Sequence, residues 1–181
     1  PDLDEKIELT RLEASALYAG IVVDTKNFAV QTGVRTFEAA AFLRRSGADP
    51  ALVRHLFRFD METLKLRALI FGNAEILKGG VVLAVCPFEV KNGQIIAAQS
   101  ADTLLNIEGV RVSFVLWPVD AGVGISARSN GEVNVQVIME AFNGGGHQTV
   151  AGAHIAGVDV VEARRRLEAV IADYIGEGKE Q

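Results

Sequence analysis

Apolar positions along the start of the chain predict a helix followed by a strand. From Glu8 to Tyr18 they recur at the spacing of a helix that buries one face. The run Ala19–Val23 contains no polar side chain. An apolar run of this length is typical of a strand buried on both faces, as in a parallel sheet. We therefore expect a buried strand that ends at Asp24.

Local signals predict two further helices before residue 60. Thr36 is suited to cap the first of them, because its hydroxyl can accept a hydrogen bond from an N–H group of the first turn. Gly47 is suited to end that helix, since glycine readily adopts the left-handed conformation that follows many helices. Asp49 and Pro50 predict the start of the next helix, with proline at its first position.

The rest of the chain alternates strands with helices. Met61–Leu77 carries apolar side chains on more than one face of a predicted helix, which we interpret as a connector between two bodies. Beyond it, strands are predicted at Val81–Glu89, Val110–Val119, Gly122–Ser129 and Ala151–Ala156, and helices at Gln94–Ile107, Val133–Phe142 and Asp159–Ile175. Alternation of this kind predicts an α/β domain with helices packed on a mixed sheet.

Composition and charge exclude several classes of protein. Of the 181 residues, 49% are apolar and 23% are charged, which is typical of a globular protein and excludes disorder. The net charge of −5 provides no basic field, so a long nucleic acid is not an expected partner. The longest apolar and glycine run, Gly79–Phe88, is shorter than the roughly 20 residues of a membrane span. We therefore expect no membrane contact. We also expect no signal peptide, because the start of the sequence is acidic and polar.

Two further observations concern the cysteine content and the first residue of the sequence. Cys86 is the only cysteine, so an internal disulfide and a thiolate metal site are both excluded. The sequence starts with Pro1 instead of methionine, which we interpret as a sign that it is part of a longer protein.

Asp24 is the first candidate for chemistry. It directly follows the predicted strand, and ligands of open α/β sheets collect at the carboxyl ends of strands. An aspartate there could coordinate a cation that handles phosphate, or it could simply cap the turn. The sequence around it offers no HxH, no HExxH and no second acidic cluster. From the residues alone, both interpretations stay open.

The glycine run Gly144-Gly145-Gly146, followed by His147, is the second candidate. Three glycines exceed what a helix end requires, and they let the backbone approach a ligand and turn several N–H groups toward an anion. His147 could donate a hydrogen bond to the same phosphate. A flexible turn also explains the run, and from the residues alone it is slightly favoured over a phosphate-binding loop.

Arg128 is the third candidate. Since strand side chains alternate, Arg128 shares a face with Ser126, while Ser129 falls at the end of the strand. A guanidinium there could grip a phosphate, or it could be a solvated surface group. His154 has no such neighbours in the sequence and receives no role.

These motifs resemble a known family. Residues 20–26, 32–40 and 47–49 are similar to the last conserved motif of the DHH phosphoesterase domain, and the later part of the chain resembles the associated DHHA1 domain. The marks of the DHHA1 domain are Ala101-Asp102, Leu104-Leu105, Ser113-Phe114-Val115, Ile125–Ser129, Val133-Asn134-Val135, Gly144–His147 and Ala151-Gly152. The resemblance covers nearly the whole chain.

The resemblance implies a division into three parts. Residues 1–58 would be the C-terminal remnant of a DHH domain, residues 59–79 a connector helix, and residues 80–181 a DHHA1 substrate-binding domain. The DHH domain of the family holds two manganese ions, and Asp24 matches its final metal-binding aspartate. The residues that match the substrate-binding motifs of the family are Arg128, Ser129, Asn134, Gly144, Gly145, Gly146 and His147.

Within this family the chain is most similar to the membrane-anchored cyclic-di-AMP phosphodiesterases of Gram-positive bacteria. That similarity implies hydrolysis of cyclic-di-AMP to the linear dinucleotide by manganese-activated water, on the cytoplasmic side of the membrane. The sequence contains no DHH triplet, and Asp24 is the one expected metal ligand that it retains. We therefore expect this chain alone to be inactive and to bind manganese weakly or not at all.

Three alternatives remain. The parent protein could be an oligoribonuclease or an adenosine-bisphosphate phosphatase of the same superfamily. The chain could instead be a non-catalytic module that binds a nucleotide or RNA, although its net charge of −5 and its content of only two tyrosines and one tryptophan argue against an extended single-strand platform. It could also serve mainly to form a homodimer, with an apolar strand such as Val110–Leu116 in an edge contact.

Overall fold

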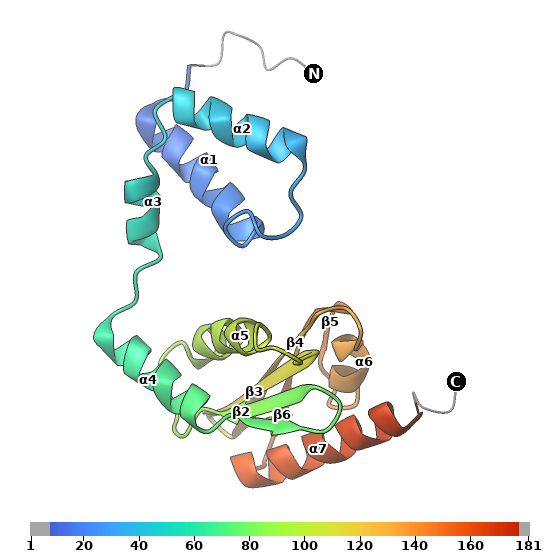
Figure 1. Cartoon of the computed structure of the whole chain (residues 1–181). Coiled ribbons are helices and arrows are strands. Elements are labelled where there is room, and N and C mark those ends of the chain that lie inside the picture. The colour runs from blue at the N-terminus through green and yellow to red at the C-terminus, as the bar shows by residue number, and fades with distance from the viewer. Residues whose placement is uncertain (1–7, 178–181) are drawn as a thin grey trace. The chain divides into compact units, whose positions relative to one another are not determined.

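The computed structural model describes residues 8–177, which divide into two compact units between Phe59 and Asp60 (Figure 1). The described part of the first unit is helical, and the second unit is built on a sheet. No helix within residues 8–177 is both long enough and apolar enough to cross a bilayer. The predicted α/β architecture is confirmed for the second unit.

The first unit contains α1 (Arg11–Asp24), α2 (Val34–Arg45) and α3 (Pro50–Leu56). The predicted strand at Ala19–Val23 is therefore wrong, because these residues form the last turns of α1. The described part of this unit contains no strand that could pair with such a segment. Since a helix satisfies its own backbone groups, an apolar run without a strand partner is stable only as a helix.

Side-chain caps mark the starts of α1 and α3. Thr10 caps α1 in a capping box with Glu13, and the Oδ1 of Asp49 accepts a 2.9 Å hydrogen bond from the N–H of Ala51 at the start of α3. The cap predicted at Thr36 is wrong, since Gly33 is the capping residue of α2.

The core of the first unit is small. It consists of the buried side chains of Ala14, Leu43 and Ala48, with a few partly buried neighbours. Arg11 of α1 forms a 2.7 Å ion pair with Asp49, which joins α1 to the start of α3. The predicted stop at Gly47 is confirmed, because this glycine follows α2 with a φ of +97°.

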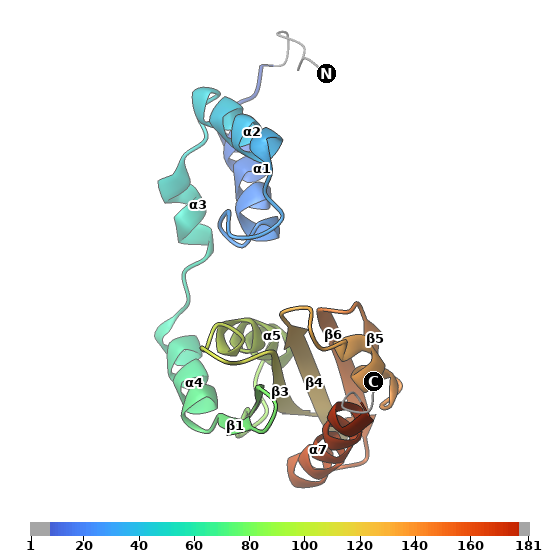
Figure 2. The same cartoon turned by 45° about the vertical axis from the view of Figure 1, so that its right-hand side comes forward.

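The second unit has a six-stranded sheet with helices on both faces (Figure 2). The strand order is β1-β2-β3-β4-β6-β5, and only the β2–β3 pair is parallel. The elements are α4 (Met61–Gly72), β1 (Glu75–Leu77), β2 (Val81–Val85), α5 (Gly93–Leu104), β3 (Val112–Val119), β4 (Gly122–Ser129), α6 (Val135–Glu140), β5 (Gly145–Gly146), β6 (Val150–Ala156) and α7 (Val160–Glu177).

Two hydrophobic cores lie on opposite faces of this sheet. One face packs on α6 and α7, with Phe114, Ile125 and Leu167 fully buried between the layers. The other face packs on α4 and α5, around Ile70 and Val115. Strand residues alternate between the two cores, as expected for a sheet that is covered on both sides.

Two predictions about this unit are wrong. The helix expected at Met61–Leu77 ends at Gly72, and Glu75–Leu77 forms the antiparallel edge strand β1 instead. The strand expected to make an edge contact in a homodimer is β3, which lies inside the sheet between β2 and β4. Its backbone groups are already paired on both sides, so it offers no free edge to a partner.

Candidate functional site

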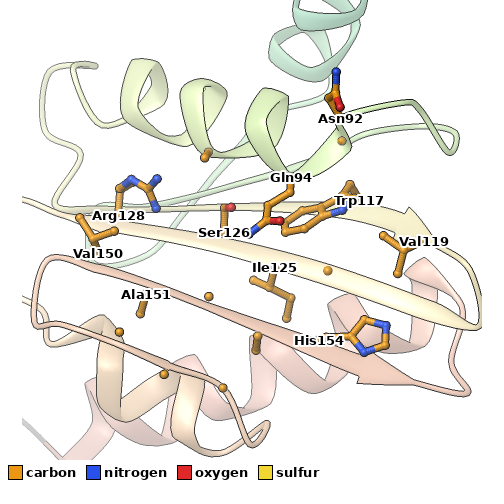
Figure 3. A pocket seen from close by; sticks show the side chains of 18 of the residues that line it. Asn92, Gln94, Trp117, Val119, Ile125, Ser126, Arg128, Val150, Ala151 and His154 are labelled. Atoms are coloured by element: carbon orange, nitrogen blue, oxygen red, sulfur yellow. The ribbon is translucent and has the colours of Figure 1, made fainter. Parts of the chain in front are cut away.

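A cleft of about 930 Å³ lies in the second unit, above one side of the sheet (Figure 3). It is lined by β3, β4 and β6, by the first turn of α5, and by the segment from Asn143 to His147. This volume is within the range of roughly 300 to 1,000 Å³ that is typical of small-molecule sites. The cleft is therefore large enough for a nucleotide.

The alternation of β4 places Arg128 in this cleft. Ile125 and Ala127 belong to the core under α6 and α7. Gly124, Ser126 and Arg128 lie on the other face and line the cleft. The prediction that Arg128 shares a face with Ser126 is confirmed, because side chains two positions apart point to the same side of a sheet.

The Arg128 guanidinium is held in place by the protein. Its Nε lies 3.3 Å from the Oδ1 of Asp102, a residue of α5, and its Nη1 donates a 2.9 Å hydrogen bond to the carbonyl oxygen of Ala127. The side chain is only 13% exposed. A cation fixed in this way on a cleft floor is suited to bind an anionic oxygen without reorganising.

Ser129 and Asn134 lie outside the cleft lining. The hydroxyl of Ser129 accepts hydrogen bonds from the N–H groups of Gly131 and Val133, at 3.0 and 3.3 Å. The Oδ1 of Asn134 caps α6 by accepting a 3.1 Å hydrogen bond from the N–H of Gln136. Both side chains stabilise the connection from β4 to α6, and the structure brings neither to the cleft.

The three glycines of the run differ in what surrounds them. A Cβ at Gly144 would lie 2.4 Å from the carbonyl oxygen of Gly152, and one at Gly146 would lie 2.3 Å from that of Val150. At Gly145 no atom lies within 4 Å of such a Cβ. Gly144 and Gly146 therefore allow the segment to pack against β6, whereas Gly145 faces open space along the cleft.

Part of the N–H nest expected here is already used by the protein. Gly144 donates its N–H to the carbonyl of Met139 at 2.9 Å, and His147 donates to Val150 at 2.7 Å. His147 and Val150 form a hydrogen-bonded pair, so by the alternation of antiparallel strands the N–H of Gly146 points away from β6. Gly146 is thus the donor of this segment best suited to an external anion.

The His147 side chain is exposed and lines the cleft. The structure thereby brings five of the predicted binding residues to one site. They are Arg128, Gly144, Gly145, Gly146 and His147.

Sequence reasoning missed the aromatic end of the cleft. Trp117 is 8% exposed and lies over Gly124, where a Cβ would be only 2.2 Å from the indole Cζ2. Gln94 and His154 also line the cleft. Counting alternate positions along Val112–Val119 would have placed Trp117 on this face, but nothing in the sequence shows that β6 and the start of α5 meet there.

Asp24 lies in the first unit, exposed at the last position of α1. A metal or phosphate site was expected at Asp24 because the residue would follow a strand, but Asp24 ends a helix instead. Within residues 8–177, no group of three or more His, Cys, Asp or Glu side chains could hold a metal ion. The described residues therefore do not fit the two-metal centre that the resemblance implies.

Comparison with known proteins identifies the family. The fold and the cleft define an α/β domain whose sheet carries a cleft with an arginine on its floor. The model of the DHHA1 domain family matches residues 78–177, and the chain belongs to this family. The resemblance stated from the motifs is confirmed.

Two relatives are similar over almost the whole chain. Cyclic-di-AMP phosphodiesterase GdpP of Geobacillus thermodenitrificans is 48% identical over 97% of this chain and 27% of that protein. Cyclic-di-AMP phosphodiesterase PdeA of Listeria monocytogenes is 45% identical over 96% of this chain and 26% of that protein. The chain thus spans only about a quarter of the length of these relatives.

A solved structure has the same fold. An exopolyphosphatase-related protein from Bacteroides fragilis matches with a TM-score of 0.81 at 22% identity. The match covers 91% of this chain and 51% of that protein. At this level of identity the likeness supports the architecture alone.

Proposed function

We propose that this chain is the substrate-holding part of a phosphodiesterase that hydrolyses cyclic-di-AMP to the linear dinucleotide pApA. One observation carries the proposal, namely that Arg128, Gly146 and His147 line one cleft of nucleotide size. The names of the relatives, which are cyclic-di-AMP phosphodiesterases, support the choice of substrate.

The proposed role of the cleft is to bind a phosphate that is not itself attacked. The Arg128 guanidinium provides a fixed positive charge, and the N–H of Gly146 and the imidazole of His147 provide further donors. Hydrolysis adds water across one P–O bond of the ring, and holding the other phosphate orients the dinucleotide for that attack.

We propose that the attacking water is activated by manganese in the whole protein, and that Asp24 is one ligand of that metal site. The described residues provide no complete ligand group, so their proposed roles concern binding. We therefore expect this chain to bind cyclic-di-AMP and not to cleave it.

Calorimetric titration of the 181-residue chain with cyclic-di-AMP, with and without manganese, tests the proposal. Chromatography of the mixture then detects any pApA. Binding without turnover is the expected result. Absence of binding would contradict the proposed role of the cleft, and turnover would contradict the incomplete metal site.

A single-stranded RNA series separates this function from that of an RNA-binding module. If the chain were an RNA-binding module, its affinity would rise with oligonucleotide length and fall steeply with salt. For a small-nucleotide cleft, we expect an affinity that does not grow beyond a dinucleotide.

A further inference from the structure

We propose that Gln94 and Ser126 form a base-reading subsite at the Trp117 end of the cleft, and that this subsite selects adenine over guanine. The inference rests on the proposed function, since it assumes that the cleft holds a nucleotide. It assigns the choice of base to two residues that lie apart from the phosphate-binding group.

Ser126 has an unused hydroxyl at the floor of the cleft. The residue is 5% exposed and lines the cleft between Gly124 and Arg128 along β4. Within the described part of the chain, no group hydrogen-bonds to this hydroxyl. The Ser126 Oγ is not among the fully buried unpaired side-chain atoms of the described residues, so it is open to the cleft, where a ligand or water can hydrogen-bond to it.

Gln94 provides the second polar group. It lies in the first turn of α5, and its side chain points toward the sheet, with the carboxamide between Ser126 and Trp117 in this view (Figure 3). Among residues 8–177, its carboxamide also has no hydrogen-bond partner. Both the donor and the acceptor of this amide are therefore available to a ligand.

Trp117 and the strand spacing fix which part of a nucleotide can reach these groups. Trp117 provides an apolar wall against which a base can pack. Ser126 and Arg128 are two positions apart on β4, or roughly 7 Å along the strand. A nucleotide whose phosphate is bound by Arg128 can therefore place its base beside Ser126 and Gln94.

The chemistry of a carboxamide favours adenine. Adenine presents an N7 acceptor beside an N6 donor, which a glutamine amide can match with its NH₂ and its oxygen together. Guanine presents two acceptors, N7 and O6, so the amide oxygen would face O6 without a hydrogen. Among the described residues that line the cleft there is no lysine, and Arg128 lies beyond Ser126 on the strand. Within this part of the chain, the Trp117 end of the cleft therefore lacks the cation that guanine prefers.

Titration of the 181-residue chain and its variants with cyclic-di-AMP and cyclic-di-GMP tests this assignment. The substitution Gln94→Leu removes the amide at similar size, and Gln99→Leu is the matched control, because Gln99 is exposed on the same helix and does not line the cleft. We expect Gln94→Leu to weaken cyclic-di-AMP binding about tenfold and cyclic-di-GMP binding less than about twofold. Gln99→Leu should leave both affinities unchanged.

Ser126→Ala provides an independent variant. Because no group of the described residues hydrogen-bonds to this hydroxyl, we expect the melting temperature to stay unchanged while cyclic-di-AMP affinity falls about three- to tenfold. Trp117, the only tryptophan of the chain, reports through its fluorescence whether the ligand occupies this cleft.

The outcomes separate this inference from the function on which it rests. If the unmodified chain binds neither dinucleotide, the proposed function fails, and the subsite fails with it. If the chain binds but Gln94→Leu weakens both ligands equally, or no more than Gln99→Leu does, only the base-reading assignment is overturned. Loss of the adenine preference in Gln94→Leu alone supports it.

Discussion

Gly144 and Gly145 are neighbours in sequence, but a side chain would meet very different surroundings at each. We expect Gly144→Ala to lower the free energy of unfolding by about 1–3 kcal/mol, because its Cβ would lie 2.4 Å from a backbone oxygen of β6. At Gly145, no atom lies within 4 Å of an added Cβ. We therefore expect Gly145→Ala to keep the stability of the fold, while its methyl group projects into the space that a ligand would occupy. Thermal denaturation and cyclic-di-AMP titration of both variants measure the two effects. Equal destabilisation by the two substitutions would contradict this account of the glycine run.

Arg128 allows a second test at the scale of a single residue. We expect Arg128→Ala to weaken cyclic-di-AMP binding about ten- to a hundredfold, since it removes a fixed, charge-assisted donor from the cleft. Arg111→Ala is the matched control, because Arg111 is 44% exposed, pairs with Glu132 and does not line the cleft. Calorimetry measures both affinities. An equal loss in the two variants would indicate a general charge effect and not a specific contact.

At the scale of elements, the hydrogen bonds that Asp49 makes at the start of α3 make the stability of the fold depend on pH. The N–H of Ala51 and then the guanidinium of Arg11 hold the pKa of Asp49 below its ordinary value of 3.8. A carboxylate whose pKa is lower in the folded chain than in the unfolded chain stabilises the fold at pH values above its unfolded pKa. This stabilisation is lost as the pH falls through its folded pKa. We expect Asp49→Asn to reduce stability at pH 7, and we expect this difference to shrink as the pH falls below 3.8 and to vanish below the lowered pKa of the folded chain. Thermal unfolding followed by circular dichroism over a pH series that starts at pH 7 and falls through this range checks the prediction, and a pH-independent difference would contradict it.

The elements also show what a sequence pattern can and cannot decide. The alternation of β4 was predictable, because a period of two is specific to strands, and it correctly placed Ser126 and Arg128 on one face. The run Ala19–Val23 was not decidable in this way, since a short apolar run fits a buried strand and a helix equally well. The edge strand β1 was missed because its three residues, Glu75–Leu77, are too few to show the period of two that identifies a strand.

At the scale of the whole molecule, the residues that meet in the cleft come from segments far apart in the chain. The sequence pointed to Arg128 and the glycine run, because an arginine at the end of an apolar strand and three consecutive glycines are uncommon patterns. Trp117 and Gln94 carry no such signal, and only the pairing of β3 with β4 and the position of α5 bring them to the same cleft. Long-range pairing of this kind is a property of the folded chain, and local sequence patterns do not contain it.

The two units have separate cores, and this leads to the last prediction. The buried residues of the first core lie at or before Ala48, whereas those of the two sheet cores lie at or after Leu66. All residues that line the cleft lie between Glu89 and His154. A domain with its own core and a complete cleft can fold and bind without a neighbouring unit. We therefore expect a shortened chain, residues 60–181, to bind cyclic-di-AMP within about twofold of the full chain, because every described residue that lines the cleft belongs to the second unit.

Calorimetry on the shortened chain measures this affinity, with Arg128→Ala in the same shortened chain as the control for specific binding. A retained affinity that depends on Arg128 would show that the second unit alone holds the nucleotide. A folded but non-binding shortened chain would show that the first unit contributes to recognition, and the cleft described here would then be only part of the site. Tryptophan fluorescence distinguishes that result from unfolding, because Trp117 is 8% exposed in the folded unit and becomes solvated when the unit unfolds.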